Sequence, residues 1–370
     1  MSLSQKKEYE YPCLEIDLTK LRENVAAMKA LCEKQGIEMA GVIKGFSGIL
    51  RCAREYEKAG VSYIASSRLE QLAAVKKDGI KTPTMCIRIS MLSEVQDLVR
   101  VADCSLQSEI AALSAVEQAA QEAGKIHDVI LMVDLGDLRE GFWTLEQLTE
   151  AALLVENDLP HVHLLGIATN LGCYGSIEAT PEKMSELIEK AEVIEKKIGR
   201  KLKYIGGGAT TSLPLVINRK MPPRINLLRI GEAAIYARDL PDFFHLPLPF
   251  LHEDVFVLKA EIIEKKVKAS HPIGNITVDA FGRRHEYEDR GMRMRALAAI
   301  GKVDYGDPFD LIPREAGVEI IGASSDHTIL DIENAERDIR IGDIIEFGVR
   351  YGTGVYLTNS PNVKQYFIEK

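Results

Sequence analysis

The sequence predicts an α/β protein in which a (β/α)8 barrel of the TIM type is followed by a mostly β C-terminal domain. Over the first two thirds of the chain, short β-branched runs alternate with amphipathic stretches of helical period. After about residue 245 the helical stretches stop, and strand-like runs continue to the end. We therefore expect a barrel over residues 12–245 and a β domain over 246–370, with residues 1–11 as a segment available to pack on the β domain.

Eight apolar runs are the expected strands of the barrel. They occupy residues 37–43, 61–66, 82–89, 101–106, 127–135, 161–169, 202–208 and 225–231. Amphipathic stretches such as 67–79, 107–124 and 179–199 lie between them, which favours parallel strands joined by crossover helices. The count of eight favours a closed barrel, with a doubly wound open sheet as the alternative, because periodicity alone does not establish closure.

The β domain is predicted from the pattern of residues 246–370. Segments such as "GVEIIGASSDHTILDI" and "IRIGDIIEFGVRYGTGVYLTN" alternate apolar and polar residues and contain no long helical stretch. Gly-Asp and Tyr-Gly pairs between the runs predict hairpin turns.

Composition argues against several classes of partner. A net charge of −9 disfavours nucleic acid and anionic membrane surfaces, since both require a basic face. The six cysteines show no CxxC spacing, which fits a reducing compartment and supports neither zinc nor a disulfide framework. No apolar run is as long as a membrane span, and the first residues, "MSLSQKKEYEYP", lack the apolar region of a secretory signal. We expect a cytoplasmic protein without a metal.

Lys44 ends the first expected barrel strand, within "AGVIKGFSG". Lysine is rarely buried without a partner, so the simplest interpretation is a side chain that emerges into solvent. The functional interpretation is a catalytic lysine, because chemistry in such barrels takes place at the carboxyl ends of the strands.

The loop after the seventh strand, "IGGGATTS" (205–212), has the composition of a phosphate site. Gly208 and its neighbours allow the backbone to approach a ligand, and Thr210 and Thr211 add hydroxyl groups. Gly231, at the end of the eighth strand, can offer backbone N–H groups to the same anion. The alternative is a plain tight turn. A phosphate loop, a strand-end lysine and a strand-eight arginine together point to pyridoxal 5'-phosphate, which lysine holds as a Schiff base.

The chain resembles the fold-type III pyridoxal-phosphate enzymes of the alanine racemase family, and most closely their alanine/ornithine racemase branch. The similarity is carried by "GVIKG", "DLGDLREG", "TNLGCYG", "AIG" with its following aspartate, and "IGASSDH". It runs from Tyr11 to the final strands. "DLGDLREG" combined with "TNLGCYG" is specific, whereas the strand-one "KG" alone is weak.

The resemblance implies roles for individual residues. Lys44 matches the lysine that forms the internal aldimine, and Arg229 in "LRIGE" matches the arginine that donates to the pyridine nitrogen. Arg139 matches the arginine near the cofactor O3' and the substrate carboxylate. Thr210 stands at the position of a phosphate-binding serine, and Tyr351 matches a tyrosine that contacts the phosphate.

Other positions depart from the pattern of the alanine racemases. Gly48 stands where a phosphate-contacting tyrosine is expected, and Asn170 replaces a histidine that packs on the cofactor ring. With Gly208, Thr211, Gly231 and Glu232, Asn170 completes the expected cofactor-binding set.

The second acid/base of the family, a tyrosine from the partner subunit, aligns with Lys302 in "AIGKVDYGD", and Tyr305 follows three residues later. We expect Lys302 or Tyr305 to act at the second face, with Lys302 preferred. The alternative is that Lys302 only binds the substrate carboxylate or forms an ion pair with Asp304. Ser325 and Asp326 stand at the family's Met-Asp pair and are expected to contact substrate together with Arg139.

The resemblance implies an amino-acid racemase that removes and returns an α-proton and works as a homodimer with shared active sites. Alanine, ornithine or another basic amino acid is the expected substrate. A basic substrate would need an acceptor for its distal amine, for which Asp279, Asp304 and Asp326 are candidates. Two alternatives remain. A decarboxylase would present a glutamate in place of Arg229, and a non-catalytic cofactor-binding protein would lack the β domain.

Overall fold

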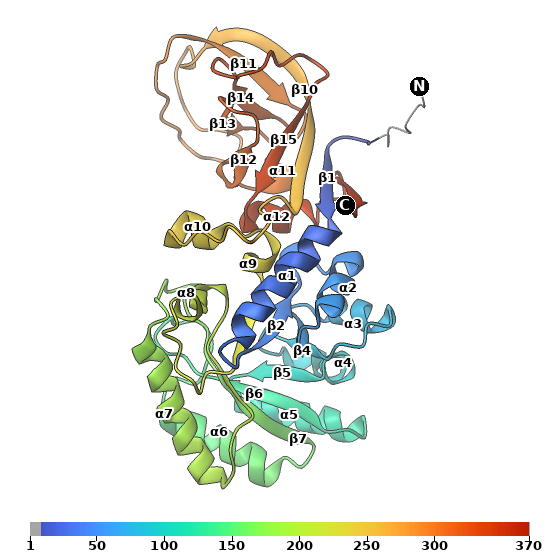
Figure 1. Ribbon diagram of the computed structural model, residues 1–370, viewed down its shortest axis with the longest axis vertical. Coiled ribbons are helices and arrows are strands. Elements are labelled where there is room, and N and C mark those ends of the chain that lie inside the picture. Colours follow the sequence, from blue (N-terminus) through green and yellow to red (C-terminus); the bar gives the residue numbers. More distant parts are fainter. Residues whose placement is uncertain (1–8, 370) are drawn as a thin grey trace. The chain divides into compact units, whose positions relative to one another are not determined.

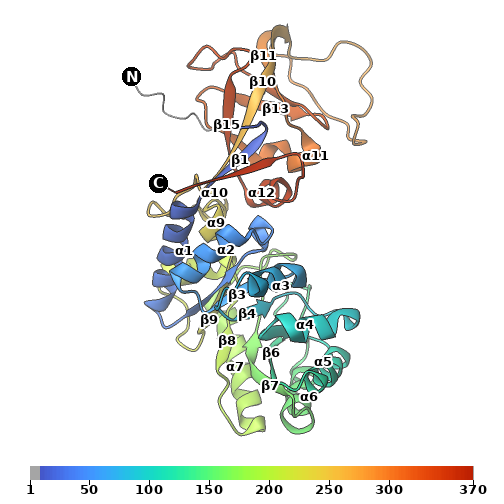
Figure 2. The same cartoon turned by 90° about the vertical axis from the view of Figure 1, so that its right-hand side faces the viewer.

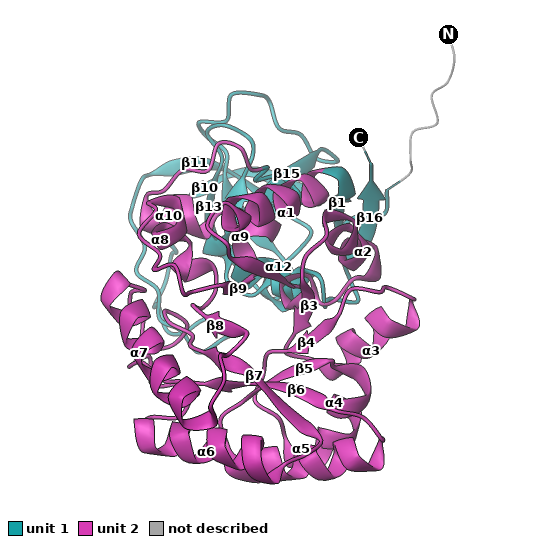
Figure 3. Cartoon of the chain, turned by 60° about the horizontal axis from the view of Figure 1, so that its bottom comes forward, with its two compact units in different colours: residues 1–19, 252–370 teal, residues 20–251 magenta. Residues whose placement is uncertain are grey.

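The computed structural model describes residues 9–369 and divides the chain into two compact units. One unit is Lys20–Leu251, and the other joins the N-terminal segment up to Thr19 to the C-terminal segment from His252 (Figure 3). None of the described helices is both long and apolar enough to cross a membrane.

The larger unit is a closed parallel barrel, which confirms the predicted fold. Its eight strands are β2 (Glu38–Val42), β3 (Tyr63–Ser66), β4 (Thr84–Cys86), β5 (Cys104–Gln107), β6 (His127–Met132), β7 (Val162–Ala168), β8 (Tyr204–Gly206) and β9 (Leu227–Ile230). Each strand pairs in parallel with the next, and β9 pairs with β2, so no edge is left open. Ala40, for example, lies between Tyr63 on one side and Arg229 on the other.

Helices follow the strands and lie on the outside of the barrel (Figure 1). They are α1 (Leu18–Glu33), α2 (Leu50–Ala59), α3 (Leu69–Lys77), α4 (Val95–Val101), α5 (Ile110–Glu122), α6 (Leu145–Asp158) and α7 (Pro181–Ile198), with short α8 (Leu213–Ile217), α9 (Glu232–Ile235) and α10 (Asp239–Phe244). Three 3-10 turns complete the unit: η1 (Lys44–Phe46), η2 (Leu92–Glu94) and η3 (Thr210–Ser212). Local sequence sets the ends of α7, where the Thr180 side chain caps the first turn, Pro181 begins the helix and Gly199 ends it in the left-handed region.

Apolar side chains fill the inside of the barrel. This core includes the small residues Ala40, Ala65 and Ala168 and the rings of Tyr63 and Tyr204, whose centroids are 6.2 Å apart. Because the interior is packed, ligands have access only at the ends of the strands, where the loops lie.

The second unit is a mostly antiparallel sheet (Figure 2). Its strands are β1 (Cys13–Asp17), β10 (Phe256–Ala269), β11 (Met292–Ala298), β12 (Leu311–Pro313), β13 (Glu319–Ala323), β14 (Thr328–Asp331), β15 (Ile344–Val349) and β16 (Lys364–Ile368). The order is β12-β15-β10-β11-β14-β13, with β1 beside β10 and β16. Between the strands lie α11 (Lys302–Tyr305), η4 (Pro308–Asp310) and α12 (Tyr351–Leu357).

Strand β1 lies within the range that the sequence assigns to the barrel, yet it pairs with β10 and β16 of the β unit. The segment before it packs there as well. Tyr9 donates its hydroxyl to Glu15 at 2.7 Å, and the Glu10 N–H donates to the Tyr366 hydroxyl at 2.9 Å. Residues 1–8 of the segment expected to pack on this domain lie outside the described residues.

Candidate active site

Lys44 is the first residue of η1, separated from the end of β2 by Ile43 alone, and is half-buried. Burial lowers the pKa of Lys44, and the positive charges of Arg139 and Arg229 lower it further, while Cys173 and Glu140 act in the opposite direction. A lysine with a lowered pKa holds more of its neutral form, which is the nucleophilic one. The structure therefore brings together three of the predicted site residues, Lys44, Arg139 and Arg229.

Arg229 lies in β9 with only 4% of its surface exposed. Its Nη2 donates to the Thr169 carbonyl at 2.8 Å, but its buried Nη1 has no hydrogen-bond partner among the described residues. Burial lowers the pKa of Arg229 to about 10, which leaves it protonated at neutral pH. A buried donor without an acceptor is costly, so this nitrogen is suited to an acceptor that a ligand brings.

The absence of a side chain at Gly206 leaves space beside Nη1 of Arg229. A Cβ at Gly206 would lie 3.4 Å from Nη1 of Arg229 and 2.7 Å from the side chain of Ala168. Glycine at this position therefore keeps the guanidinium and the neighbouring strand end clear.

Arg139 belongs to the loop after β6 and forms an ion pair with Glu140 through two of its nitrogens. Asp137 of the same loop is buried and accepts hydrogen bonds from the N–H groups of Gly172 at 2.9 Å and Tyr174 at 3.1 Å. These bonds fasten the loop after β6 to the loop after β7. Asp137 thus fixes the place of Arg139, a role that sequence reasoning did not assign.

The predicted phosphate loop has a backbone that only small residues allow. Gly208 has a φ of +110°, and a Cβ there would lie 2.6 Å from Oγ of Ser212. The same hydroxyl donates to the Gly207 carbonyl at 2.6 Å, so the loop folds tightly on itself. Gly231 precedes α9, and a Cβ there would lie 3.3 Å from Cβ of Val42. Both glycines leave room for a ligand to approach the main chain.

The two threonines of this loop have different hydrogen bonds. Thr210 is buried, and its Oγ1 accepts from the Ala233 N–H at 3.4 Å. Thr211 donates its hydroxyl to the Leu171 carbonyl at 2.7 Å, which ties this loop to the loop after β7. The Thr210 hydroxyl keeps its proton for a further acceptor, whereas the Thr211 proton is used within the protein.

Asn170 and Glu232 complete the predicted cofactor set. Nδ2 of Asn170 is buried without a partner among the described residues. Glu232 is also buried, and its Oε1 accepts from the N–H groups of Arg238 at 2.8 Å and Asp239 at 3.0 Å. Burial raises the pKa of Glu232 to about 7, with a further contribution from Asp239. Glu232 therefore organises the turn before α10.

In the β unit, Lys302 begins α11 against the turn that follows β13. Its N–H donates to the Ser324 carbonyl at 3.0 Å, and the Val303 N–H donates to the Ser325 carbonyl at 3.2 Å. A Cβ at Gly301 would lie 2.1 Å from the Ser325 carbonyl oxygen, so only glycine allows this approach. The predicted residues Lys302 and Ser325 are thus held together.

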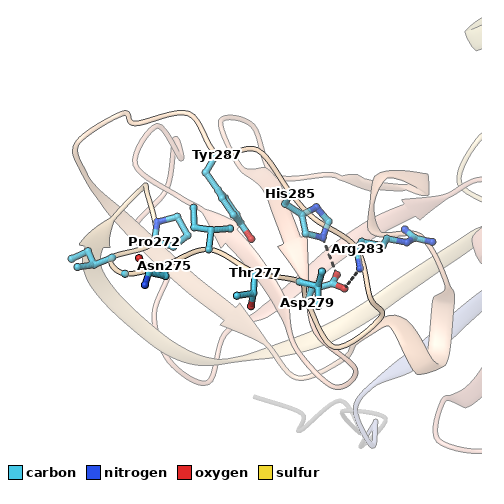
Figure 4. A pocket seen from close by; sticks show the side chains of 11 residues that line it. Pro272, Asn275, Thr277, Asp279, Arg283, His285 and Tyr287 are labelled. Carbon is cyan, nitrogen blue, oxygen red and sulfur yellow. Dashed lines mark hydrogen bonds and ion pairs between the residues drawn. The ribbon is translucent and has the colours of Figure 1, made fainter.

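The amine of Lys302 lies among side chains of a distant segment. Its Nζ is 3.6 Å from Oδ2 of Asp279 and 4.6 Å from the centre of the Phe281 ring. The same Oδ2 is 2.8 Å from Nε2 of His285 (Figure 4). Sequence reasoning named Asp279 as an acceptor for a substrate amine and missed its pairing with Lys302.

Tyr305, the other candidate for the second face, is fully buried. Its hydroxyl lies 2.6 Å from Oγ1 of Thr328, which itself donates to the Ile300 carbonyl at 2.7 Å. Tyr305 is therefore the donor of the first bond. Burial raises the pKa of Tyr305 to about 12. This hydroxyl therefore donates its proton to a partner inside the unit.

The remaining predicted residues of this unit are closer to the surface. Asp326 is exposed and accepts a hydrogen bond from the Ser325 hydroxyl at 2.7 Å. Tyr351 is half-buried and begins α12. The predicted site residues thus form two groups, one at the strand ends of the barrel and one in the β unit.

The fold and the barrel-end lysine define the class of protein, and comparison with known proteins agrees. Residues 16–239 match the family described as alanine racemase, N-terminal domain. The chain belongs to this family, and it is an amino-acid racemase, an isomerase.

Individual relatives are similar over nearly the whole chain. An ornithine racemase of Acetoanaerobium sticklandii is 40% identical over 92% of this chain and 95% of its own length. A lysine racemase of Thermotoga maritima is 36% identical over 96% of this chain and 98% of its own length. The alanine racemase of Streptomyces lavendulae matches in structure with a TM-score of 0.74, covering 98% of both chains at 19% identity. This last likeness shows the fold alone.

Proposed function

We propose that this protein racemises a basic amino acid, ornithine or lysine, with pyridoxal 5'-phosphate as cofactor. The observation that carries the proposal is the buried, unpaired Nη1 of Arg229 beside the half-buried Lys44 at the strand ends of the barrel. The substrate follows from the two relatives at 36–40% identity, whose names are ornithine racemase and lysine racemase.

The residues present fit this cofactor, as the family implies. Arg229 offers a donor to the pyridine nitrogen and, being an arginine, retains its own proton. Gly208, Gly231 and Thr210 offer a cradle for the phosphate, and Lys44 is the point of covalent attachment. When bound, the cofactor draws electrons from the α-carbon of an attached amino acid and so acidifies its α-hydrogen.

Racemisation needs one group to remove the α-proton on one face and a second group to supply a proton on the other. We assign Lys44 to one face and Lys302 to the other. Burial and neighbouring cations keep Lys44 able to exist as a neutral amine. Lys302 is preferred to Tyr305 because the Tyr305 hydroxyl is buried and already donates to Thr328. Arg139 is assigned to the substrate carboxylate.

The distal ammonium of the substrate needs an acceptor, and Asp326 is the candidate that the hydrogen bonds favour. The carboxylate of Asp304 accepts from Ser360 at 2.6 Å and from Asn362 at 3.0 Å. That of Asp279 is paired with His285. Asp326 is exposed and bonded to its neighbour Ser325, with which we assign it to substrate binding.

We further infer a cytoplasmic homodimer in which the β unit of one subunit completes the barrel site of the other. The two groups of site residues lie in different units of the chain. Trp143 and Tyr174, on the loops after β6 and β7, are 58% and 71% exposed, as expected for apolar side chains that a second copy covers. Mixing inactive Lys44→Ala and Lys302→Ala proteins should restore activity in hybrid dimers. A fully active monomer would contradict the shared site.

The two-lysine assignment is tested by exchange of the α-hydrogen in deuterated water, measured separately from each enantiomer of ornithine. Lys302→Ala should abolish exchange from one enantiomer and preserve it from the other. Equal loss from both enantiomers would show that Lys302 only positions the substrate.

A further inference from the structure

We propose that Asp279 is a positioning residue for Lys302, and that segment 270–291 thereby sets the place of the amine that acts at the second face. The proposal rests on the role proposed above for Lys302. Residues 270–291 connect β10 to β11, and the proposed racemisation does not otherwise use them.

The amine of Lys302 contacts two residues of this segment. Asp279 places a carboxylate oxygen 3.6 Å from Nζ, and the ring of Phe281 lies 4.6 Å from it. The Lys302 side chain is only 9% exposed, so water screens the ion pair less than it would on an open surface. The carboxylate and the ring both attract the amine and so hold it in place.

Asp279 is itself firmly held. Its Oδ1 accepts from the N–H groups of Phe281 at 2.8 Å and Arg283 at 2.9 Å. Its Oδ2 is shared between Lys302 and His285, with Nε2 of His285 at 2.8 Å (Figure 4). The His285 bond and the main-chain donors hold the pKa of Asp279 well below its usual range. Asp279 thus presents a fixed negative charge to the amine.

His285 lies at the border between this pair and solvent. Asp279 and His285 line a cavity of about 190 Å³, together with Asn275, Thr277 and Tyr287. The His285 side chain is 39% exposed. Its hydrogen bond to Oδ2 of Asp279 orients the same carboxylate oxygen that lies beside Lys302.

Two other aspartates of the β unit lie in α11 or in the turn beside it. Asp326 lies in the turn whose carbonyl groups accept from the start of α11. Asp304 of α11 is buried, with its carboxylate hydrogen-bonded to other side chains. Asp279 is the carboxylate that forms an ion pair with the Lys302 amine, so its alteration should change the position of that amine most directly.

The test uses the holoenzyme and follows α-hydrogen exchange for each enantiomer. For the enantiomer whose exchange depends on Lys302, Asp279→Asn should lower the exchange rate at least about tenfold, because the amine loses the ion pair that holds it in place. The rate from the other enantiomer should stay unchanged, and Asp279→Glu, which restores a carboxylate, should recover part of the lost exchange. Arg284→Gln, an exposed change of charge on the same segment, is the matched control and should lower neither rate.

A second readout does not depend on turnover. Competitive acetylation at a fixed pH, followed by mass spectrometry, reports how accessible the Lys302 amine is, and Asp279→Asn should raise its rate of acetylation relative to the other lysines. Asp279→Ser, which removes the ion pair but keeps an oxygen acceptor for the main-chain N–H groups, should give the same increase and serves if the asparagine variant does not fold.

The results separate failure of this proposal from failure of the proposed function. Unchanged exchange and unchanged acetylation in both Asp279→Asn and Asp279→Ser would overturn the positioning role. Equal losses of exchange from both enantiomers would also overturn it, because they would indicate a general structural effect. Exchange from both enantiomers that survives in Lys302→Ala would instead overturn the assignment of Lys302 itself.

Discussion

Gly301→Ala is expected to break the contact that places Lys302. The added Cβ would lie 2.1 Å from the carbonyl oxygen of Ser325, 2.3 Å from its carbonyl carbon and 2.4 Å from the nitrogen of Asp326. All three are main-chain atoms, so the start of α11 would have to move away from the turn after β13 by about 1 Å before the contact becomes ordinary.

The size of the effect follows from this movement. Overpacking of a tight contact costs about 1–3 kcal/mol. The two main-chain hydrogen bonds from Lys302 and Val303 to this turn contribute about 1 kcal/mol each and would be lost. We expect a destabilisation of about 4 kcal/mol, which corresponds to a decrease in Tm of roughly 10 °C for a domain of this size.

The assay is thermal unfolding followed by far-UV circular dichroism, together with α-hydrogen exchange from each enantiomer. Exchange on the face assigned to Lys302 should fall at least about tenfold, while exchange on the Lys44 face is retained. Gly322→Ala is the control, because a Cβ at this position of β13 meets nothing within 4 Å. A Gly301→Ala protein that melts and exchanges like the Gly322→Ala protein would refute the reasoning.

Three further predictions concern the barrel unit. Lys44→Ala should abolish covalent attachment of the cofactor, seen as loss of its visible absorption, and should lower racemisation at least about a thousandfold; near wild-type turnover would show the assignment to be wrong. Burial alone would raise the pKa of Glu195, but hydrogen bonds from Lys201 and Arg224 outweigh burial and lower it. The ionised Glu195 side chain therefore stabilises the folded protein at neutral pH, and this contribution is lost as the pH falls. Urea midpoints of wild type and Glu195→Gln should therefore converge between about pH 6 and pH 3, and a constant difference would contradict this. Asp137→Ala removes the carboxylate that accepts from main-chain N–H groups of the next loop and should cost about 3 kcal/mol, with faster proteolysis in that loop; unchanged cleavage would argue against its bracing role.

The barrel could be predicted because each of its strands and helices carries its own periodic signal. The strand that ends at Lys44 and the strand that contains Arg229 are separated widely in sequence, yet β2 and β9 are neighbours in a closed barrel. The order of the strands in the sequence was therefore enough to predict that Lys44 and Arg229 lie at the same end of the barrel. Strand β1 gives no such signal, because five residues do not show which sheet they will join.

The second group of site residues was harder to predict, since its geometry depends on contacts between distant segments. "GKVDYGD" does not reveal that the Tyr305 hydroxyl is taken by Thr328, nor that the Lys302 amine lies beside Asp279. Both partners come from other parts of the β unit. The close approach at Gly301 likewise follows from tertiary packing and has no signature in the local sequence.

The most direct test of the central claim is racemisation of single-enantiomer amino acids by the purified protein with pyridoxal 5'-phosphate, followed by chiral chromatography. We predict that L- and D-ornithine or L- and D-lysine are interconverted with a kcat/KM at least about a hundredfold above that for alanine, a difference of about 2.7 kcal/mol in transition-state stabilisation. Alanine as the best substrate would contradict the proposed specificity, and decarboxylation in place of racemisation would contradict the proposed function.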